Sequence, residues 1–321
     1  MIDFSNEKAA ADSLVKKVEE LKQEVGKVII GQETIVHGLI TAIISNGHAL
    51  LIGVPGLAKT LLIKTISEAL DLSFSRIQFT PDLMPSDILG SEILDETKQF
   101  KFHKGPVFAN IVLADEINRT PPKTQAALLE AMQEKNVTIS GTNYPLNLPF
   151  FVLATQNPIE QEGTYPLPEA QLDRFMFNMV LDYPTKDEEI SIVKATTSLQ
   201  KNTVKPVLNQ EQIMGFQELV KKVPVTDHVL DYAVTLVGKT RANRPLATPF
   251  VNEYLEYGAG PRASQYLIIG AKTHALIKGK YSPDIEDVQA VAKMVLRHRI
   301  VRNYRAEAQG ISADDIIERI I

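Results

Sequence analysis

The sequence predicts an α/β protein in which a five-stranded parallel sheet is followed by an all-α domain. A short apolar run at residues 49–52 leads into a glycine-rich turn and then into a helical pattern. Four further apolar runs alternate with helical patterns up to residue 183, which is typical of parallel strands joined by crossover helices. Every pattern after that residue is helical. We therefore expect an α/β domain over 1–183 and a helical domain over 184–321.

The composition is that of an ordinary globular protein of about two domains. Of 321 residues, 44% are apolar and 23% are charged. With 34 basic and 39 acidic residues the net charge is −5, so no overall positive field attracts nucleic acid or anionic lipid. The chain has no cysteine, which excludes disulfides and thiol nucleophiles, and its histidines lack the close spacing of a metal cluster.

The amino-terminal residues and the apolar runs predict a cytoplasmic protein. Residues 1–20 carry too many charges for a secretory signal peptide. No apolar run approaches the roughly 20 residues that a membrane-spanning helix needs. We therefore expect no membrane span.

Two helices are predicted ahead of the glycine-rich turn, at residues 7–25 and 34–46. The segment between them includes Ile29, Ile30 and Gly31. One interpretation is a turn that packs on the core. The other is an apolar slot for a purine base, because the segment comes shortly before the glycine-rich turn.

Residues 53–60, GVPGLAKT, predict a phosphate-binding loop. A strand, a glycine-rich turn and a helix in this order aim free backbone N–H groups and the helix dipole at one point. Lys59 supplies a positive charge for the outer phosphates, and the Thr60 hydroxyl is a ligand for Mg²⁺. The strict motif has glycine before the lysine, whereas Ala58 stands here and the second glycine is Gly56. The alternative is a plain strand-to-helix turn rich in glycine and proline.

A second candidate strand ends in acids. Residues 110–114 are mostly apolar and lead directly into Asp115 and Glu116, as a buried parallel strand does at its carboxyl edge. There Asp115 would hold Mg²⁺ through water, and Glu116 would polarise a water molecule against the γ-phosphate. The alternative is a strand that ends in solvated acids.

The remaining strands of the predicted sheet lie near residues 76–79, 150–157 and 176–181. Asn157 stands at the tip of one of them, where it would hydrogen-bond the attacking water or the γ-phosphate, or would only satisfy a turn before Pro158. Two hairpins are also expected, one with an arm at 99–103 and one at 137–144. Phe100 and Phe102 in the first hairpin would contact a substrate or pack on the core.

The predicted helical domain opens with a capping box, Thr185 to Glu188. Helices are expected at 187–199, 210–222, 227–241, 262–278 and 284–300. Arg262 lies in the first turn of one of them, where its charge opposes the helix dipole. Either a bound phosphate or a nearby acid would compensate that charge.

Together these motifs resemble the AAA+ ATPases and, within them, the MoxR family. GVPGLAKT resembles the phosphate loop of that family, alanine included, and VLADEINR with PPKTQAALLEAMQE is similar to its Walker B strand and following helix. ATQNP resembles sensor 1, LPEAQLDRF the arginine-finger segment, and GAGPRA the start of the sensor 2 helix. In the last, Gly260 stands where serine is more frequent. The resemblance covers residues 20–305.

The resemblance implies an AAA+ P-loop core with an all-α lid that binds and hydrolyses ATP with Mg²⁺. The implied catalytic residues are Lys59, Glu116, Asn157 and Arg174. The implied metal-holding residues are Thr60 and Asp115. The implied nucleotide-binding residues are Ile30, Gly31, Val54, Pro55, Gly56, Leu57, Ala58, Lys59, Thr60, Leu61 and Arg262.

The same resemblance implies a homo-oligomer, usually a hexameric ring, in which Arg174 acts on the γ-phosphate of the neighbouring subunit. The hairpins near 97–104 and 136–147 would be insertions that face the ring pore or its surface. MoxR-type ATPases are thought to be chaperone-like remodelling machines that mature metalloproteins or other protein clients. They often act with a protein that carries a von Willebrand factor A domain, which here would be a separate chain.

Other functions fit less well. A signalling GTPase needs an Asn-Lys-x-Asp guanine reader, which Asn157-Pro158-Ile159-Glu160 is not. A small-molecule kinase would not need a five-helix domain with Arg262. An AAA+ protein of nucleic acid or transcription complexes would be nearer, but the acidic balance and the lack of a DNA-binding motif argue against it. A nucleotide-gated scaffold with little turnover is a further alternative, against which Glu116 and Arg174 argue.

Overall fold

The computed structural model describes residues 2, 4–94, 99–159, 163–197 and 202–321. The chain forms two compact units. We call the one made of Lys17–Leu167 and Met179–Met214 the α/β unit. The other, made of Met1–Lys16, Pro168–Asn178 and Gly215–Ile321, is the helical unit.

The predicted five-stranded sheet is present. Its strands are β1 (Ala49–Ile52), β2 (Phe74–Gln78), β5 (Ile111–Asp115), β8 (Phe151–Gln156) and β9 (Phe177–Val180), in the order β2-β5-β8-β1-β9. The pairs β2–β5, β5–β8 and β8–β1 are parallel, and Leu153 of β8 lies between Leu113 and Ala49. All of β5 and nearly all of β1 and β8 are buried, which explains why these segments read as unbroken apolar runs.

This strand order decides where polar groups meet. Because β5, β8 and β1 are neighbours and run in the same direction, their carboxyl ends lie at one edge of the sheet. The glycine-rich loop follows β1, Asp115 and Glu116 stand at the end of β5, and Asn157 follows β8. Parallel α/β sheets bind ligands at this edge, outside the carboxyl ends of the strands.

The helices of the α/β unit precede, connect or follow the strands of its sheet. α2 is buried along most of its length, as the core helix that its apolar sequence predicts, and α3 packs against β2 and β5. The elements are α1 (Glu7–Gly26), whose residues from Lys17 onward belong to this unit, α2 (Glu33–Ile44), α3 (Lys59–Ala69), α4 (Pro85–Leu89), η1 (Pro106–Phe108), η2 (Ile117–Arg119), α5 (Pro122–Glu134) and α7 (Lys186–Thr196).

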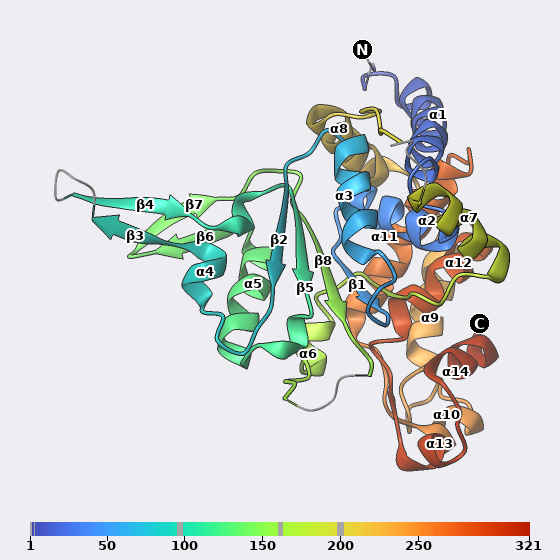
Figure 1. Cartoon of the computed structure of the whole chain (residues 1–321). Coiled ribbons are helices and arrows are strands. Elements are labelled where there is room, and N and C mark those ends of the chain that lie inside the picture. Colours follow the sequence, from blue (N-terminus) through green and yellow to red (C-terminus); the bar gives the residue numbers. More distant parts are fainter. Residues whose placement is uncertain (1, 3, 95–98, 160–162, 198–201) are drawn as a thin grey trace. The chain divides into compact units, whose positions relative to one another are not determined.

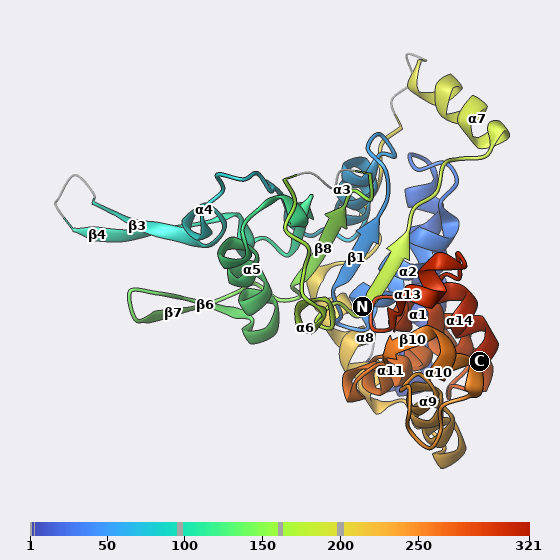
Figure 2. The same ribbon diagram turned by 90° about the horizontal axis from the view of Figure 1, so that it is seen from below.

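The two predicted hairpins are present and lie side by side, projecting beyond α4 and α5 (Figures 1 and 2). One pairs β3 (Gly90–Leu94) with β4 (Phe100–Lys104), and the other pairs β6 (Asn136–Ile139) with β7 (Thr142–Pro145). The ring of Phe102 stacks on Tyr144, with centroids 4.1 Å apart. Phe102 is therefore a packing residue, whereas Phe100 is 74% exposed. Residues 97 and 98 of the first predicted hairpin lie outside the described residues.

The helical unit is less purely helical than predicted. Its helices are α6 (Glu169–Leu172), α8 (Gln210–Lys222, which begins in the α/β unit), α9 (Asp227–Lys239), α10 (Pro249–Tyr254), α11 (Pro261–Ile277), α12 (Ile285–Leu296), α13 (Tyr304–Ala308) and α14 (Ala313–Ile320). An antiparallel pair, β10 (Leu255–Tyr257) and β11 (Val301–Arg302), was not predicted. Strands of three and two residues are too short to show an alternating pattern. Residues 198 and 199 of the predicted helix 187–199 lie outside the described residues.

The sequence predicted one domain boundary, near residue 184, whereas each of the two units is built from separate stretches of the chain. Residues after that point are tied to the α/β unit: Val207 N–H donates to the Ala69 carbonyl at 2.8 Å, and Lys205 N–H donates to Glu24 at 3.1 Å. Residues 168–178 belong instead to the helical unit. Such long-range hydrogen bonds leave no mark in local sequence patterns. Within the described ranges, no helix combines the length and the apolar character needed to cross a membrane.

Candidate nucleotide site

The glycine-rich loop has the backbone shape of an anion-binding turn. Gly56 has φ 87° and Ala58 has φ 55°, so the chain bends twice through the left-handed region before α3 begins at Lys59. Ala58 is the N-cap residue of α3 and has no side chain that accepts a hydrogen bond, so the first N–H groups of α3 are uncapped. The left-handed φ also explains why glycine is usual at the position of Ala58.

Lys59 lies close to the acids of β5. Its Nζ donates a hydrogen bond to the Gly53 carbonyl at 2.5 Å. Burial lowers the pKa of Lys59, while the charges of Asp115 and Glu116 act in the opposite direction. The loop lysine and the two acids therefore share one electrostatic environment at the edge of the sheet.

Asp115 is buried and both of its carboxylate oxygens accept hydrogen bonds. The Thr155 hydroxyl donates to Oδ1 at 2.6 Å. Arg76 donates to Oδ2 from Nη2 at 2.6 Å and from Nε at 3.1 Å. These bonds fix the orientation of the carboxylate, so the alternative of a freely solvated acid does not hold for Asp115.

Glu116 has a left-handed backbone, with φ 57°. Its N–H donates to the Thr155 hydroxyl oxygen at 2.9 Å, which helps to hold this costly conformation. Its Oε2 accepts hydrogen bonds from Gln78 and Arg119, each at 3.0 Å. The carboxylate is thus held by two side chains.

Asn157 is buried, and only part of its amide is satisfied. Its Oδ1 accepts a hydrogen bond from the Ile159 N–H at 3.1 Å, which is the turn that the sequence suggested. Its Nδ2 has no hydrogen-bond partner among the described residues. A buried donor without a partner is costly, so this amide is suited to a ligand oxygen or a water molecule.

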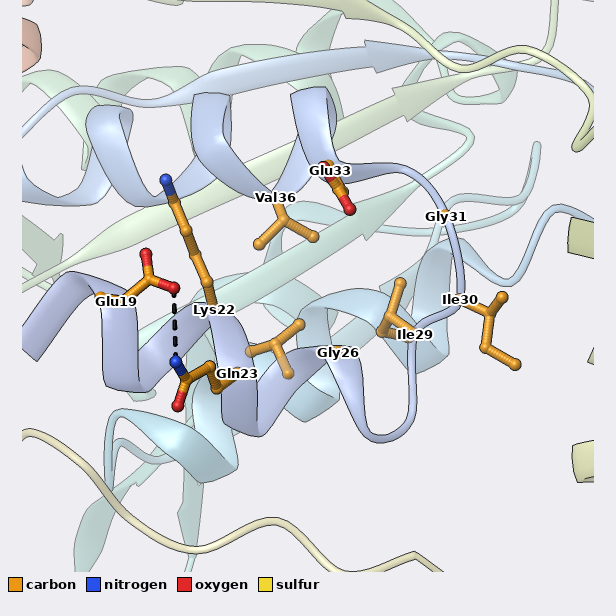
Figure 3. Close-up of a pocket in the computed structure, with 10 residues that line it drawn as sticks. Glu19, Lys22, Gln23, Gly26, Ile29, Ile30, Gly31, Glu33 and Val36 are labelled. Atoms are coloured by element: carbon orange, nitrogen blue, oxygen red, sulfur yellow. Dashed lines mark hydrogen bonds between the residues drawn. The ribbon is translucent and has the colours of Figure 1, made fainter.

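The segment between α1 and α2 borders a cavity of about 540 Å³, within the size range of small-molecule sites (Figure 3). Ile29, Ile30 and Gly31 line it together with residues of α1 and α2. The side chains of Ile29 and Ile30 extend to opposite sides of the segment (Figure 3). Ile29 is buried, as a core-packing turn requires, whereas Ile30 is half-buried. Gln32 Nε2 donates to the Leu57 carbonyl at 3.5 Å, which links this segment to the glycine-rich loop.

Arg174 and Arg262 belong to the helical unit and lie near each other within it. Arg262 Nη1 donates to Asp173 Oδ2 at 3.0 Å. Of the two partners that the sequence suggested for Arg262, a phosphate or a nearby acid, the acid is therefore present in this structure. The Arg174 carbonyl accepts a hydrogen bond from the Tyr266 hydroxyl at 3.3 Å. The structure thus groups the predicted site residues by unit, with Lys59, Asp115, Glu116 and Asn157 in one and the two arginines in the other.

Four side chains that hold the acids were missed by the sequence reasoning: Arg76, Gln78, Arg119 and Thr155. Arg76 and Gln78 lie two residues apart on β2 and therefore share one face of the strand. Thr155 is a buried polar residue inside an apolar strand, two residues before Asn157. A polar side chain inside an otherwise apolar strand was the sequence feature that could have identified Thr155 as a site residue.

The residues fit a magnesium ion that is held mainly by phosphates and water. No group of three His, Asp or Glu side chains suited to a metal occurs in the described parts of the chain. Mg²⁺ commonly uses only one or two protein ligands beside substrate phosphates. Because Arg76 and Thr155 already occupy the oxygens of Asp115, this carboxylate fits contact through a water molecule.

A parallel sheet with a glycine-rich loop and a lysine after one strand, and paired acids after its neighbour but one, is typical of P-loop nucleoside triphosphatases. Comparisons with known proteins narrow this class. The family model of the ATPase family associated with various cellular activities (AAA) matches residues 48–177, and that of the AAA lid domain matches residues 249–320.

The chain is 42% identical over 315 residues to Chaperone MoxR1 of Mycobacterium tuberculosis, covering 97% of this chain and 83% of that protein. It is 41% identical over 305 residues to the uncharacterised protein YeaC of Bacillus subtilis, covering 93% and 91%. The crystal structure of a candidate ATPase from Cytophaga hutchinsonii matches with a TM-score of 0.91 at 44% identity, covering 97% and 95%. The chain belongs to the MoxR family of AAA+ ATPases.

Proposed function

We propose that this ATPase binds ATP with Mg²⁺ at the carboxyl edge of the sheet and works as a ring-forming, chaperone-like remodelling machine. The observation that carries the proposal is the convergence there of a lysine, two oriented acids and the amide of Asn157, which has a donor to spare. These are the groups that phosphoryl transfer to water requires: a charge for the phosphates, an acceptor for the water proton and a positioning donor.

The phosphates are bound by the loop. The backbone N–H groups of Val54, Gly56, Leu57 and Ala58 and the uncapped start of α3 at Lys59, Thr60 and Leu61 surround the anion, with Pro55 shaping the turn. Lys59 leaves the Gly53 carbonyl to contact the outer phosphates. Thr60 and a water molecule held by Asp115 would hold Mg²⁺, which would neutralise phosphate charge.

Hydrolysis depends on Glu116 and Asn157. Glu116 releases a hydrogen bond from Gln78 or Arg119 and accepts one from the attacking water, while Asn157 Nδ2 donates to the water or the γ-phosphate.

The adenine base of the nucleotide binds against Ile30 and Gly31. Gly31 has φ 69°, and a Cβ added there would lie 2.5 Å from Glu188, so no larger residue fits without a shift.

Two arginines of the helical unit complete the proposed site. Arg262 contacts the phosphates of the nucleotide bound by its own subunit. Arg174 acts on the γ-phosphate of the next subunit, where such a finger is worth roughly 10³ to 10⁵ in rate. This requirement is the reason to propose a ring, and six subunits are the proposed number.

The test of the ATPase site is steady-state phosphate release by wild type and Lys59→Ala at equal ATP. Lys59→Ala should lose nucleotide affinity because the charge partner of the phosphates is absent. Wild-type affinity and turnover in that variant would contradict the site.

The test of the ring is a mixing experiment. Specific activity should rise with protein concentration, Arg174→Ala should bind ATP but turn it over feebly, and a mixture of Arg174→Ala with Lys59→Ala should regain activity. Mixed subunits would then provide interfaces in which an intact loop meets an intact arginine. Activity per subunit that is independent of concentration, with a silent mixture, would refute the action of Arg174 on a neighbour.

We propose a protein client, because a relative 42% identical to this chain is named a chaperone. A separate partner with a von Willebrand factor A domain is proposed from the family resemblance. Capture of bound proteins by the Glu116→Gln variant with ATP, compared with Lys59→Ala, identifies both. Equal capture by the two variants would contradict an ATP-dependent client.

A further inference from the structure

Asp173 is the acidic centre of a cluster of positive charges in the helical unit. Its Oδ2 accepts a hydrogen bond from Arg262 Nη1 at 3.0 Å, and its Oδ1 accepts one from Arg299 Nε at 2.8 Å. One carboxylate therefore lies between two guanidinium groups, one from the start of α11 and one from the segment that follows α12.

The two arginines are held in different ways. Arg299 has only 2% of its side chain exposed, and it also donates to the carbonyls of Asp173, at 2.8 Å, and Phe175, at 2.6 Å. Arg262 has 39% of its side chain exposed, and among the described residues its side chain donates one hydrogen bond, to Asp173. A partly exposed ion pair is weak, while a buried, multiply bonded arginine is costly to displace. Arg262 is therefore the arginine that can exchange partners.

The same cluster also contacts the backbone of Arg174, the residue after Asp173. The Tyr266 hydroxyl, one turn beyond Arg262 on α11, donates to the Arg174 carbonyl at 3.3 Å. The Arg299 guanidinium lies 5.0 Å above the Tyr266 ring. Arg174 and Arg262 are thus carried by one set of contacts within one compact unit.

We propose that Asp173 is a positioning residue that holds Arg262 while no nucleotide is bound, and that the ATP phosphates compete with Asp173 for it. This inference rests on the proposed contact between Arg262 and the nucleotide. A phosphate group carries more negative charge than a carboxylate and accepts several guanidinium hydrogen bonds, so it is the stronger partner. Arg299 stays on Asp173 throughout and keeps the segment before Arg174 in place.

The test measures affinity for Mg²⁺ and the non-hydrolysable analogue adenylyl imidodiphosphate in four proteins: wild type, Asp173→Asn, Arg262→Ala and the double variant. Asp173→Asn removes the competing charge but keeps an oxygen for Arg299. It should bind the analogue about two- to fivefold more tightly than wild type. In the Arg262→Ala background the same change should have no effect. Glu169→Gln, which removes an exposed charge from the neighbouring α6, is the matched control and should bind as wild type does.

A second measurement uses the unaltered chain and does not depend on folding of the Asp173 variant. Labelling of carboxylates with a carbodiimide and an amine, followed by mass spectrometry, reports the accessibility of Asp173. The analogue should increase labelling of Asp173 in wild type, because Arg262 leaves it. In Arg262→Ala labelling should be high from the start, and that of Glu169 should not change.

The outcomes separate the two ideas. If Arg262→Ala binds the analogue as wild type does, the proposed contact of Arg262 with nucleotide fails. If Arg262→Ala binds more weakly but Asp173→Asn does not bind more tightly, the role of Asp173 is overturned. It is also overturned if Asp173→Asn tightens binding equally without Arg262, or if the analogue leaves the labelling of Asp173 unchanged.

Discussion

Thr155 holds both acids of the site, and its removal should affect stability and turnover together. Its hydroxyl accepts the Glu116 N–H at 2.9 Å and donates to Asp115 Oδ1 at 2.6 Å, and the residue is fully buried. Thr155→Val keeps the shape but removes both bonds. A buried polar group left without a partner costs about 1–3 kcal/mol, so the variant should lose about 2–4 kcal/mol of unfolding free energy.

The effect on turnover follows from the backbone of Glu116. Its left-handed conformation, with φ 57°, costs about 1–2 kcal/mol and is held partly by the bond to Thr155. In the proposed mechanism Glu116 accepts a hydrogen bond from the attacking water, and without the bond to Thr155 it relaxes away from that position, so the ATPase rate should fall at least about tenfold. Urea denaturation and phosphate release measure the two effects.

Thr155→Ser is the matched control. It keeps the hydroxyl and removes one methyl group, which should cost about 1 kcal/mol of stability and leave turnover nearly unchanged. If Thr155→Val unfolds at the wild-type urea concentration and hydrolyses ATP at the wild-type rate, the hydroxyl does not position the acids.

Three further predictions concern the loop, the acid and a buried histidine. Ala58→Gly relieves a φ of 55° and should raise the unfolding free energy by about 1 kcal/mol in urea denaturation; a loss of stability would contradict the strained loop. Gln78→Ala removes one of the two bonds to the Glu116 carboxylate, worth about 1 kcal/mol, of which the proposed mechanism releases one, so basal hydrolysis should rise about fivefold, and an unchanged or lower rate would show that Gln78 positions the acid instead. Burial lowers the pKa of His48 from 6.5 to about 4, so its stabilising contribution is present above pH 6.5 and is lost as the pH falls through this range to about 4. His48→Gln should unfold with a weaker dependence on pH between 6.5 and 4, and an unchanged dependence would refute this role.

Much of the fold could be predicted because the buried strands are short, apolar and separated by helical patterns. The positions of the glycine-rich loop and of the acids could also be predicted, since both stand directly after such strands, at 53–60 and 115–116. A strand that ends in polar residues identifies one edge of the sheet from local sequence alone.

The features that could not be predicted from the sequence depend on contacts between residues far apart in the chain. Arg76 and Thr155 meet Asp115 from 39 and 40 positions away, and Arg299 meets Asp173 from 126 positions away. Local patterns carry no information on such pairs. The strands β10 and β11 were missed because the pairing of Tyr257 with Val301, 44 positions further along the chain, defines them rather than their own residues.

The central claim is that Glu116 takes part in hydrolysis and not in binding. Its most direct test compares wild type with Glu116→Gln, measuring affinity for ATP with Mg²⁺ and phosphate release on the same samples. The amide can keep the bonds that shape the site but cannot accept a proton from water, so binding should be retained while turnover falls by about 10²-fold or more. Equal turnover in the two proteins would contradict the assignment of Glu116 and, with it, the catalytic site at the carboxyl edge of the sheet.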